Sequence, residues 1–76
     1  MSLKSKFGAE TCRARNRLGL TQEQLAEAVS VTPRSIQYIE KGAWMPKSTT
    51  MLRLMYRLKI PAETFADELV RPETEE

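Results

Sequence analysis

The stretch LTQEQLAEAVSVTPRSIQYIEKG, residues 20–42, predicts two short helices joined by a tight turn. The first helix opens at Thr21, whose side chain can cap free backbone N–H groups while Gln24, three residues later, reaches back to complete a capping box. The second opens at Thr32 and has Pro33 at its first position, where a missing N–H costs nothing. The rest of the fold is predicted outward from this pair.

The link between the two helices is only residues 30–32, and so short a link forces them to cross steeply. At the closest approach the first helix needs a small side chain, and Ala26 is well placed to provide it. Leu25 and Ala28 add to the apolar face of the first helix. The side chains expected to fill the wedge between the helices are apolar: Val29, Val31, Ile36 and Ile39.

Three more helices are predicted outside this pair. Residues 5–17 form one, and Gly19 ends it as a left-handed C-terminal cap would. Another begins at Ser48 and the last at Pro61, while the second helix of the central pair runs to Lys41. The positions that form the apolar stripes of these three helices are Phe7, Thr11, Ala14 and Leu18, then Met51, Leu52, Leu54, Met55 and Leu58, then Phe65, Leu69 and Val70.

No strand alternation appears, so the predicted fold class is all-α: a compact five-helix bundle in one domain over residues 1–70. Its core is expected to be marginal, because a domain of roughly 60 residues buries only about 60% of its unfolded surface. Pro72 and the acidic residues after it predict a disordered acidic tail over residues 71–76.

The net charge of +2 conceals an uneven distribution of charged residues along the chain. Residues 1–62 contain 11 of the 12 Lys and Arg but only four acidic residues, a net charge of +7. Residues 63–76 contain one basic and six acidic residues, a net charge of −5. A basic body suits a polyanionic partner, and an acidic end suits a solvated segment kept away from that partner.

Several classes of site and location are excluded by the composition. Cys12 is the single cysteine and there is no histidine, so the chain offers no internal disulfide framework and no Cys/His zinc site. Residues 1–7 lack the apolar region of a signal peptide, and no apolar run approaches the ~18 residues of a membrane span. Without a Gly-rich phosphate loop or a nucleophile beside a base, we expect a cytoplasmic, non-enzymatic protein with no metal, cofactor, membrane or small-molecule substrate.

The second helix of the pair, residues 33–41, carries a polar face for which a small protein has no internal use. At 100° per residue, Ile36, Ile39 and Glu40 lie within about 100° of one another and face inward. The opposite face carries Arg34, Tyr38 and Lys41, with Gln37 at its edge and Thr32 and Pro33 at the exposed N-terminal end.

The chemistry of these outer side chains matches that of duplex DNA. Arg34 can make a bidentate contact to guanine O6 and N7, and Tyr38 and Thr32 can contact a base or a phosphate. The start of the first helix, with Gln22 and free N–H groups, is a natural phosphate seat, and Lys41 and Lys47 flank the following loop. These features predict a helix that enters the DNA major groove.

Residues 13–65 resemble the lambda-repressor/Cro (XRE) helix-turn-helix family of transcription regulators. The resemblance implies five helices, sequence-specific duplex binding and a two-fold dimer. The residues that carry it, in order, are Arg15, Gly19-Leu20-Thr21-Gln22, Leu25-Ala26, Ser35-Ile36, Ile39-Glu40, Gly42, Pro46, Thr50-Met51, Leu54, Leu58, Ile60-Pro61 and Phe65.

The resemblance also implies a role for individual positions. It places Gln22 on a phosphate, and it pairs Arg15 with Glu40 as a partly buried ion pair between the first and third helices. The positions that it assigns to base reading or backbone contact in the recognition helix are Thr32, Pro33, Arg34, Ser35 and Tyr38.

Three features depart from the family pattern. Ser30 stands where the family often has Gly, and a left-handed Ser costs roughly 1 kcal/mol relative to Gly. Pro33 cannot read a base, which leaves fewer side chains to define specificity. The loop over residues 43–45 is apolar, so contacts between this loop and the DNA backbone are not expected from its composition.

The function expected from these observations is that of a small homodimeric repressor bound to an inverted-repeat operator. The apolar surface expected at the dimer interface consists of Phe65, Leu69 and Val70, extended by Trp44. Two alternatives remain open: an antitoxin or restriction-modification controller that represses its own operon, with or without a regulatory protein partner, and a protein-interaction module on the same fold.

Overall fold

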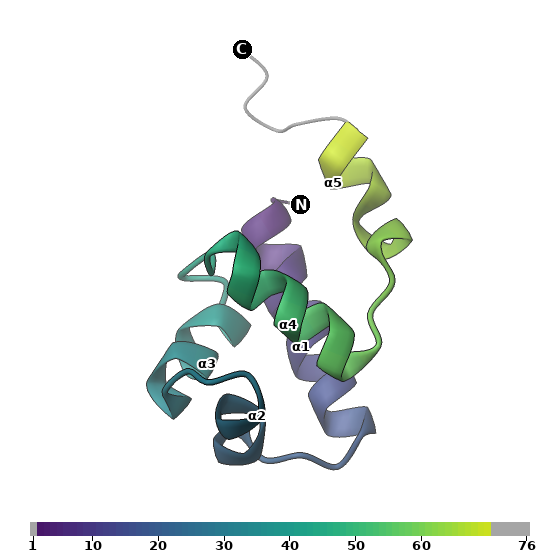
Figure 1. Cartoon of the computed structure of the whole chain (residues 1–76). Coiled ribbons are helices and arrows are strands. Elements are labelled where there is room, and N and C mark those ends of the chain that lie inside the picture. Colours follow the sequence, from purple (N-terminus) through teal and green to yellow (C-terminus); the bar gives the residue numbers. More distant parts are fainter. Residues whose placement is uncertain (1, 71–76) are drawn as a thin grey trace.

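Five α-helices and one short 3₁₀ helix make up residues 2–70, which are the residues described by the computed structural model (Figure 1). The acidic tail expected over residues 71–76 lies outside the described residues. No strand occurs within residues 2–70, so the predicted all-α fold class is confirmed. The elements in chain order are α1 (Leu3–Arg17), α2 (Gln22–Ala28), α3 (Pro33–Glu40), α4 (Ser48–Leu58), the 3₁₀ helix η1 (Ala62–Phe65) and α5 (Ala66–Val70).

The helix boundaries differ from the prediction in four places. α2 ends at Ala28, one residue early, with Val29 as its C-cap. α1 begins at Leu3 rather than at residue 5, because the Ser2 hydroxyl accepts a hydrogen bond from the Ser5 N–H at 3.1 Å and caps the helix. α3 ends one residue early, with Lys41 as its C-cap. The single helix expected from Pro61 is divided into η1 and α5.

The caps that open α2 and α3 are those expected from the sequence. The Gln24 N–H donates to Thr21 Oγ1 at 3.0 Å, and the Thr21 N–H donates to Gln24 Oε1 at 2.9 Å, which completes the capping box. At α3, the Ser35 N–H donates to Thr32 Oγ1 at 3.2 Å. Both helices therefore begin where a side chain satisfies a backbone N–H that has no helical partner.

The first four α-helices all end in the same left-handed turn. The residues with positive φ after α1, α2, α3 and α4 are Gly19 (73°), Ser30 (61°), Gly42 (75°) and Lys59 (56°). In each turn the next residue's N–H donates to a carbonyl five residues back, as from Val31 to Ala26 at 3.0 Å. The strained backbone expected at Ser30 is present, and Lys59 adopts the same conformation without a sequence signal that predicted it.

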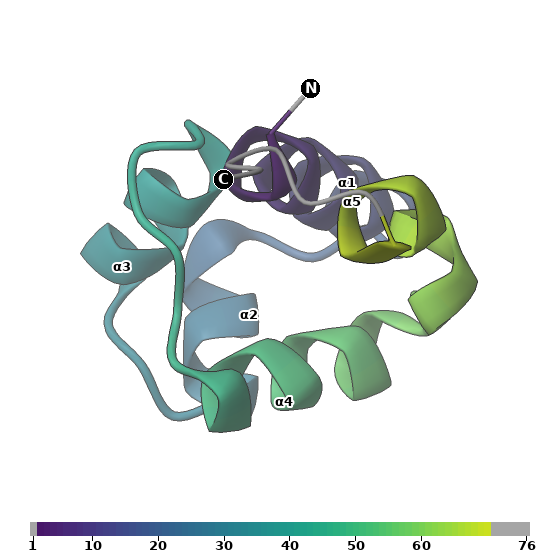
Figure 2. The same cartoon turned by 90° about the horizontal axis from the view of Figure 1, so that it is seen from above.

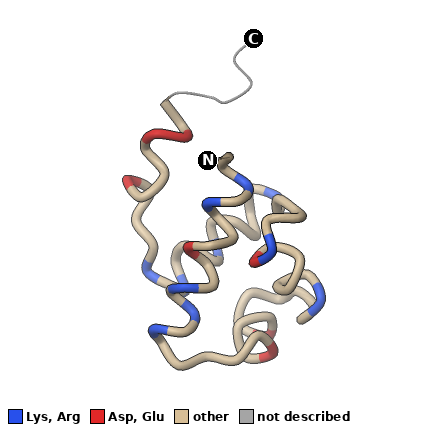
Figure 3. The backbone as a smooth tube through the Cα atoms, turned by 180° about the vertical axis from the view of Figure 1, so that it is seen from behind, with Lys and Arg blue, Asp and Glu red and all other residues tan. Residues whose placement is uncertain are grey.

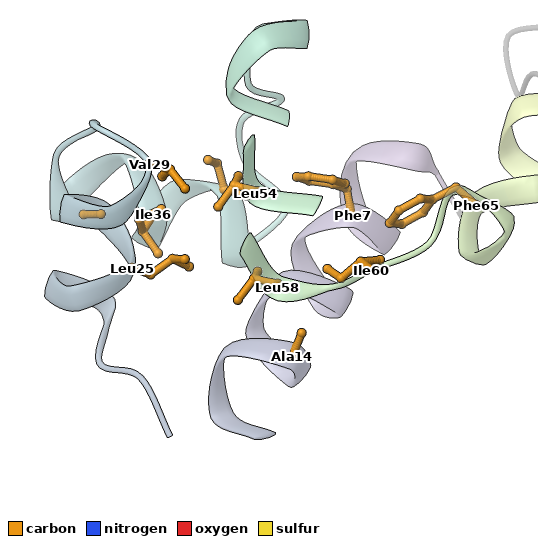
Figure 4. Close-up of a cluster of buried hydrophobic side chains, with 11 residues drawn as sticks. Phe7, Ala14, Leu25, Val29, Ile36, Leu54, Leu58, Ile60 and Phe65 are labelled. Atoms are coloured by element: carbon orange, nitrogen blue, oxygen red, sulfur yellow. The ribbon is translucent and has the colours of Figure 1, made fainter. Parts of the chain in front are cut away.

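The core lies where α1, α2, α3 and α4 converge, with η1 closing one end (Figure 4). Ile36 and Ile39 of α3 are fully buried, and Leu54 and Leu58 of α4 are too. Figure 2 shows α4 on one side of the bundle and α1 on another, with α2 and α3 packed beside them. The remaining buried apolar side chains are Phe7, Ala14, Leu25, Ala26, Val29, Ile60 and Phe65.

Three side chains expected on the apolar faces of the first four helices are instead exposed. Leu18 follows the last residue of α1 and is 40% exposed. Leu52 is 64% exposed, because at 100° per residue it lies about 160° from the buried Leu54. Ala28 is exposed because α2 turns Ala26, rather than Ala28, toward the core.

α1 and α3 approach so closely that only glycine fits at one position between them. A Cβ at Gly8 would lie 2.1 Å from the Ile39 carbonyl oxygen and 3.2 Å from that of Glu40. Gly8 therefore lets the middle of α1 rest on the backbone at the C-terminal end of α3.

Gly8→Ala is expected to destabilise the protein by about 1–3 kcal/mol, because the new methyl group forces α1 away from the backbone of α3. In an ordinary helix interior the same change stabilises the protein by about 1 kcal/mol. The sign of the change in the free energy of unfolding therefore tests whether α1 and α3 are in close contact at Gly8. Thermal and urea unfolding measure the difference. Ala9→Gly, at the neighbouring position, is the control for helix propensity and should lose about 1 kcal/mol. A gain in stability for Gly8→Ala would contradict the close contact.

Candidate nucleic-acid interface

The outer face of α3 presents polar side chains over a firmly packed inner face. Ile36 and Ile39 are fully buried, and the Tyr38 ring between them in sequence is 43% exposed on the opposite side. Five of the six residues expected to read bases or contact the DNA backbone from this helix are exposed: Thr32, Pro33, Arg34, Gln37 and Tyr38. Within the described residues no ion pair engages the guanidinium of Arg34.

Two of the expected base-reading residues have a structural role at the start of α3. The Thr32 hydroxyl accepts from the Ser35 N–H and lies 3.0 Å from Ser35 Oγ, where either hydroxyl can donate. Ser35 is also half-buried. Both hydroxyl groups therefore take part in the helix cap, and one of the two hydroxyl protons remains free to donate to a partner.

Arg15 and Glu40 form the ion pair that the family resemblance implied. Arg15 Nε donates to Glu40 Oε2 at 2.6 Å, and Nη2 donates to Glu40 Oε1 at 3.2 Å. Arg15 Nη1 also donates to the Leu20 carbonyl oxygen at 2.8 Å. The pair joins α1 to α3, and its side chains are 12% and 7% exposed, so water competes weakly for these bonds.

Hydrogen bonding to Glu40 raises the pKa of Arg15 above its ordinary value. Burial opposes this shift, and the nearby charge of Glu40 adds to it. Arg15 therefore remains a cation at every pH at which the protein would be studied, and it keeps its hold on α3.

Gln22, expected on a phosphate, is part of the same network. Its Nε2 donates to Glu40 Oε1 at 3.0 Å, which links the first residue of α2 to the last residue of α3. An amide nitrogen carries two N–H groups, so one of them is still available after this bond is made. Glu40 thus fixes the position of the side chain from which a phosphate contact is expected.

The other two residues expected to contact phosphate, Lys41 and Lys47, are both exposed. Lys41 is the C-cap of α3 and Lys47 is the N-cap of α4, so they lie at the two ends of the connecting loop. Figure 3 shows Lys and Arg positions along α1, α3 and α4, whereas α2 and the η1–α5 end carry acidic positions. Within the described residues, the acidic positions after residue 62 thus gather at one end of the molecule.

The four residues expected at a dimer interface do not share one environment. Phe65 is 1% exposed and its ring centroid lies 5.5 Å from that of Phe7, so it belongs to the core and is not available to a second copy. Its inclusion in the interface was wrong, because η1 turns this side chain inward to close the bundle. Leu69, Val70 and Trp44 are 54%, 74% and 41% exposed, respectively.

Sequence reasoning missed two contributions to the position of α3. Gly8 was not recognised, although a glycine inside an otherwise regular helix is a signal of close backbone approach. The Leu20 carbonyl, which accepts from Arg15, gave no signal because any residue type can offer a carbonyl. Within residues 2–70, no three His, Cys, Asp or Glu side chains gather to hold a metal ion, and no helix is long and apolar enough to cross a membrane.

The contribution of the Arg15–Glu40 pair is measurable by a double-mutant cycle in urea unfolding. Glu40→Leu should cost about 3–5 kcal/mol, because it leaves a buried guanidinium and the Gln22 amide without their acceptor. Arg15→Met with Glu40→Leu should cost less than the sum of the two single changes. The nearby Arg13–Glu10 pair at 2.7 Å is the matched control.

Arg13 is 63% exposed, so the same cycle on Arg13 and Glu10 should give less than about 1 kcal/mol. Equal coupling energies for the two pairs would refute the special role of Arg15 and Glu40 in holding α3 against α1.

The family of the chain follows from its match to known domains. A family model described as a helix-turn-helix domain matches residues 7–67, which is most of the chain. Curated proteins gave no match. The matched span runs from Phe7 through the whole of α2, α3 and α4. The chain therefore belongs to the helix-turn-helix domain family of DNA-binding proteins, in agreement with its resemblance to the lambda-repressor/Cro (XRE) group.

Proposed function

We propose that this protein is a sequence-specific transcription regulator, a homodimeric repressor that acts by occupying an inverted-repeat operator. In this proposal α3 lies in the major groove, and two copies related by a two-fold axis place their α3 helices in successive major grooves. The half-sites would then lie about 34–36 Å apart, or about 10–10.5 bp.

The observation that carries the proposal is the contrast between the two faces of α3. Its inner face is fixed by buried isoleucines and by the Glu40 carboxylate, while its outer face holds exposed hydrogen-bonding side chains. Because the backbone of such a helix is already ordered, binding of its outer side chains to base edges does not cost the conformational entropy of ordering that backbone. The helix-turn-helix match supports the same use of α3.

Specificity is assigned to three side chains of α3. Arg34 is placed to donate two parallel hydrogen bonds to guanine, and Gln37 has the amide geometry that suits adenine N6 and N7. Tyr38 can donate its hydroxyl proton or pack its ring on a thymine methyl group. Pro33 has no N–H and no polar side chain, so we assign it van der Waals contact only.

Phosphate contacts are assigned to Gln22, Lys41 and Lys47. Gln22 would use the N–H that remains after its bond to Glu40, so the network that fastens α3 would also hold the protein on the backbone. Lys41 and Lys47 are exposed at the two ends of the α3–α4 loop. These contacts position the protein and do not read the sequence.

Arg34→Ala is expected to relax specificity at one base pair of each half-site. Loss of a bidentate contact should weaken binding by roughly 5- to 150-fold, which corresponds to about 1–3 kcal/mol. The measurement is selection of binders from a randomised duplex pool at about 0.15 M salt, where exposed charges beyond about 8 Å are screened. The wild-type protein should enrich an inverted repeat, and the variant should lose one position of its consensus.

Arg17→Ala is the control, because Arg17 is an exposed arginine on α1 rather than α3. It should leave the selected consensus unchanged. A wild-type pool that stays random would contradict sequence-specific binding and favour a protein-interaction module on the same fold.

Lys41→Ala and Lys47→Ala should act differently from Arg34→Ala. Each should weaken binding to every duplex to a similar extent and reduce the slope of log K against log salt concentration by about 1. Titrations at several salt concentrations, with the selected operator and with an unrelated duplex, measure both effects. A change in base preference without a change in slope would remove that lysine from the phosphate contacts.

A further inference from the structure

The outer face of α4 is apolar and basic, although the bundle makes no use of it. Leu52 and Tyr56 lie one helical turn apart and are 64% and 89% exposed. Arg53 and Arg57 lie next to them at 100° per residue, and both are exposed. In the described part of the chain neither arginine forms an ion pair. We refer to Leu52, Arg53, Tyr56 and Arg57 as the α4 basic face.

An open groove adjoins this face at the C-terminal end of α4. Its volume is about 600 Å³, and it is lined by Met55, Tyr56, Arg57, Lys59, Ile60 and Pro61. The lining combines apolar side chains with two cations. Such a surface suits an apolar segment that carries negative charge.

The outer face of α5 has that complementary composition. Asp67, Leu69 and Val70 are exposed, together with Ala66, whereas Glu68 is half-buried and lies 3.6 Å from Lys6 of α1. Leu69, Ala66, Val70 and Asp67 follow one another around the helix within about 160°, with Glu68 on the opposite side. We refer to Ala66, Asp67, Leu69 and Val70 as the α5 acidic face.

α5 also lacks the burial that would stabilise so short a helix. It has five residues and none of them is buried within its own chain. Isolated helices shorter than about 12–15 residues are marginal in water, so packing must supply what propensity does not. Contacts on the α5 acidic face would supply it.

The occupant of the α4 basic face is inferred to come from another copy of the chain. The burial of Phe65 against Phe7 and the Lys6–Glu68 ion pair hold α5 beside α1, with Leu69 and Val70 turned outward. Figures 1 and 2 show α5 beside the start of α1 and at the opposite end of the molecule from α2. We propose that the α5 acidic face of one copy docks on the α4 basic face and its groove in a second copy.

This inference rests on the proposed homodimer and deepens it by naming the surface that receives α5. In a closed two-fold dimer the contact occurs twice, since α5 of each copy reaches α4 of the other. Opposite charges then meet at both contacts: Glu63 and Asp67 on one side, and Arg53, Arg57 and Lys59 on the other. A dimer in which α5 packs only on α5 would instead bring like charges together.

A charge swap without DNA tests the inference. One variant carries Arg53→Glu and Arg57→Glu, and the other carries Glu63→Lys and Asp67→Lys. Sedimentation equilibrium up to high micromolar protein should show each variant dimerising at least tenfold more weakly than the wild type. An equimolar mixture should form heterodimers with nearly wild-type affinity, because each acidic face then meets a basic face and each reversed face meets its reversed partner.

Two further variants keep the test independent of folding. Glu23→Lys with Glu27→Lys changes an exposed pair at the same spacing on α2 and should not alter dimerisation. Tyr56→Ser removes a side chain that is 89% exposed in its own chain, so it should keep the wild-type circular dichroism while weakening the dimer tenfold. Its melting temperature should equal that of the wild type at low concentrations, where both proteins are monomers.

The outcomes that would overturn the inference are equally definite. They are a monomeric wild type at high micromolar concentration, charge variants that dimerise like the wild type, or a mixture that gains nothing over its components. None of these outcomes touches the base-specific loss expected for Arg34→Ala, which is read on DNA and not from the oligomeric state.

Discussion

The contact between α1 and α3 is the constraint on which the rest of the structure depends. At Gly8 the two backbones lie so close that there is no room for a side chain. Two turns further along α1, Arg15 Nε donates a hydrogen bond to Glu40 Oε2 at 2.6 Å. One contact is steric and the other is electrostatic, yet both act on the last turn of α3. Because α3 is only two turns long, fixing its last turn and burying Ile36 and Ile39 leaves it little freedom to tilt.

Polar contacts between three helices of the bundle meet at the Glu40 carboxylate. It accepts from two nitrogens of Arg15 and from the Gln22 amide, and in this way α1, α2 and α3 meet at a single acceptor. Burying a carboxylate whose side chain is only 7% exposed would cost free energy if these donors were absent. The donors and the carboxylate therefore stabilise the bundle as one network. The same unit sets the distance between the start of α2 and the end of α3, which are two of the places from which phosphate contacts are proposed.

Local backbone chemistry made much of this fold predictable, and long-range packing made the rest unpredictable. The capping residues Thr21 and Thr32, and the left-handed turn at Gly19, depend on neighbouring residues alone, so the sequence pattern identifies them. The left-handed turn at Ser30 was suggested only by the family resemblance. The close approach at Gly8 depends on a helix 30 residues away, so a glycine within a helix signals such a contact but does not identify the backbone that it meets. Phe65 looked like surplus apolar surface because its partner, Phe7, is distant in sequence. For the site, spacing identified the outer side chains of α3, but the commitment of the Thr32 and Ser35 hydroxyls to each other required the geometry.

The inner face of α3 holds the helix in the bundle and its outer face does not, so the two faces can change differently over evolutionary time. The side chains of Arg34, Gln37 and Tyr38 make no hydrogen bond or ion pair that supports the bundle within residues 2–70, so substitutions there are expected to be nearly neutral for stability. Thr32 and Ser35 are bound to the helix cap and are less able to vary. The lineage can thus drift toward new target sequences through a few positions while its scaffold stays under selection, and duplicated copies can acquire separate targets without passing through an unfolded intermediate.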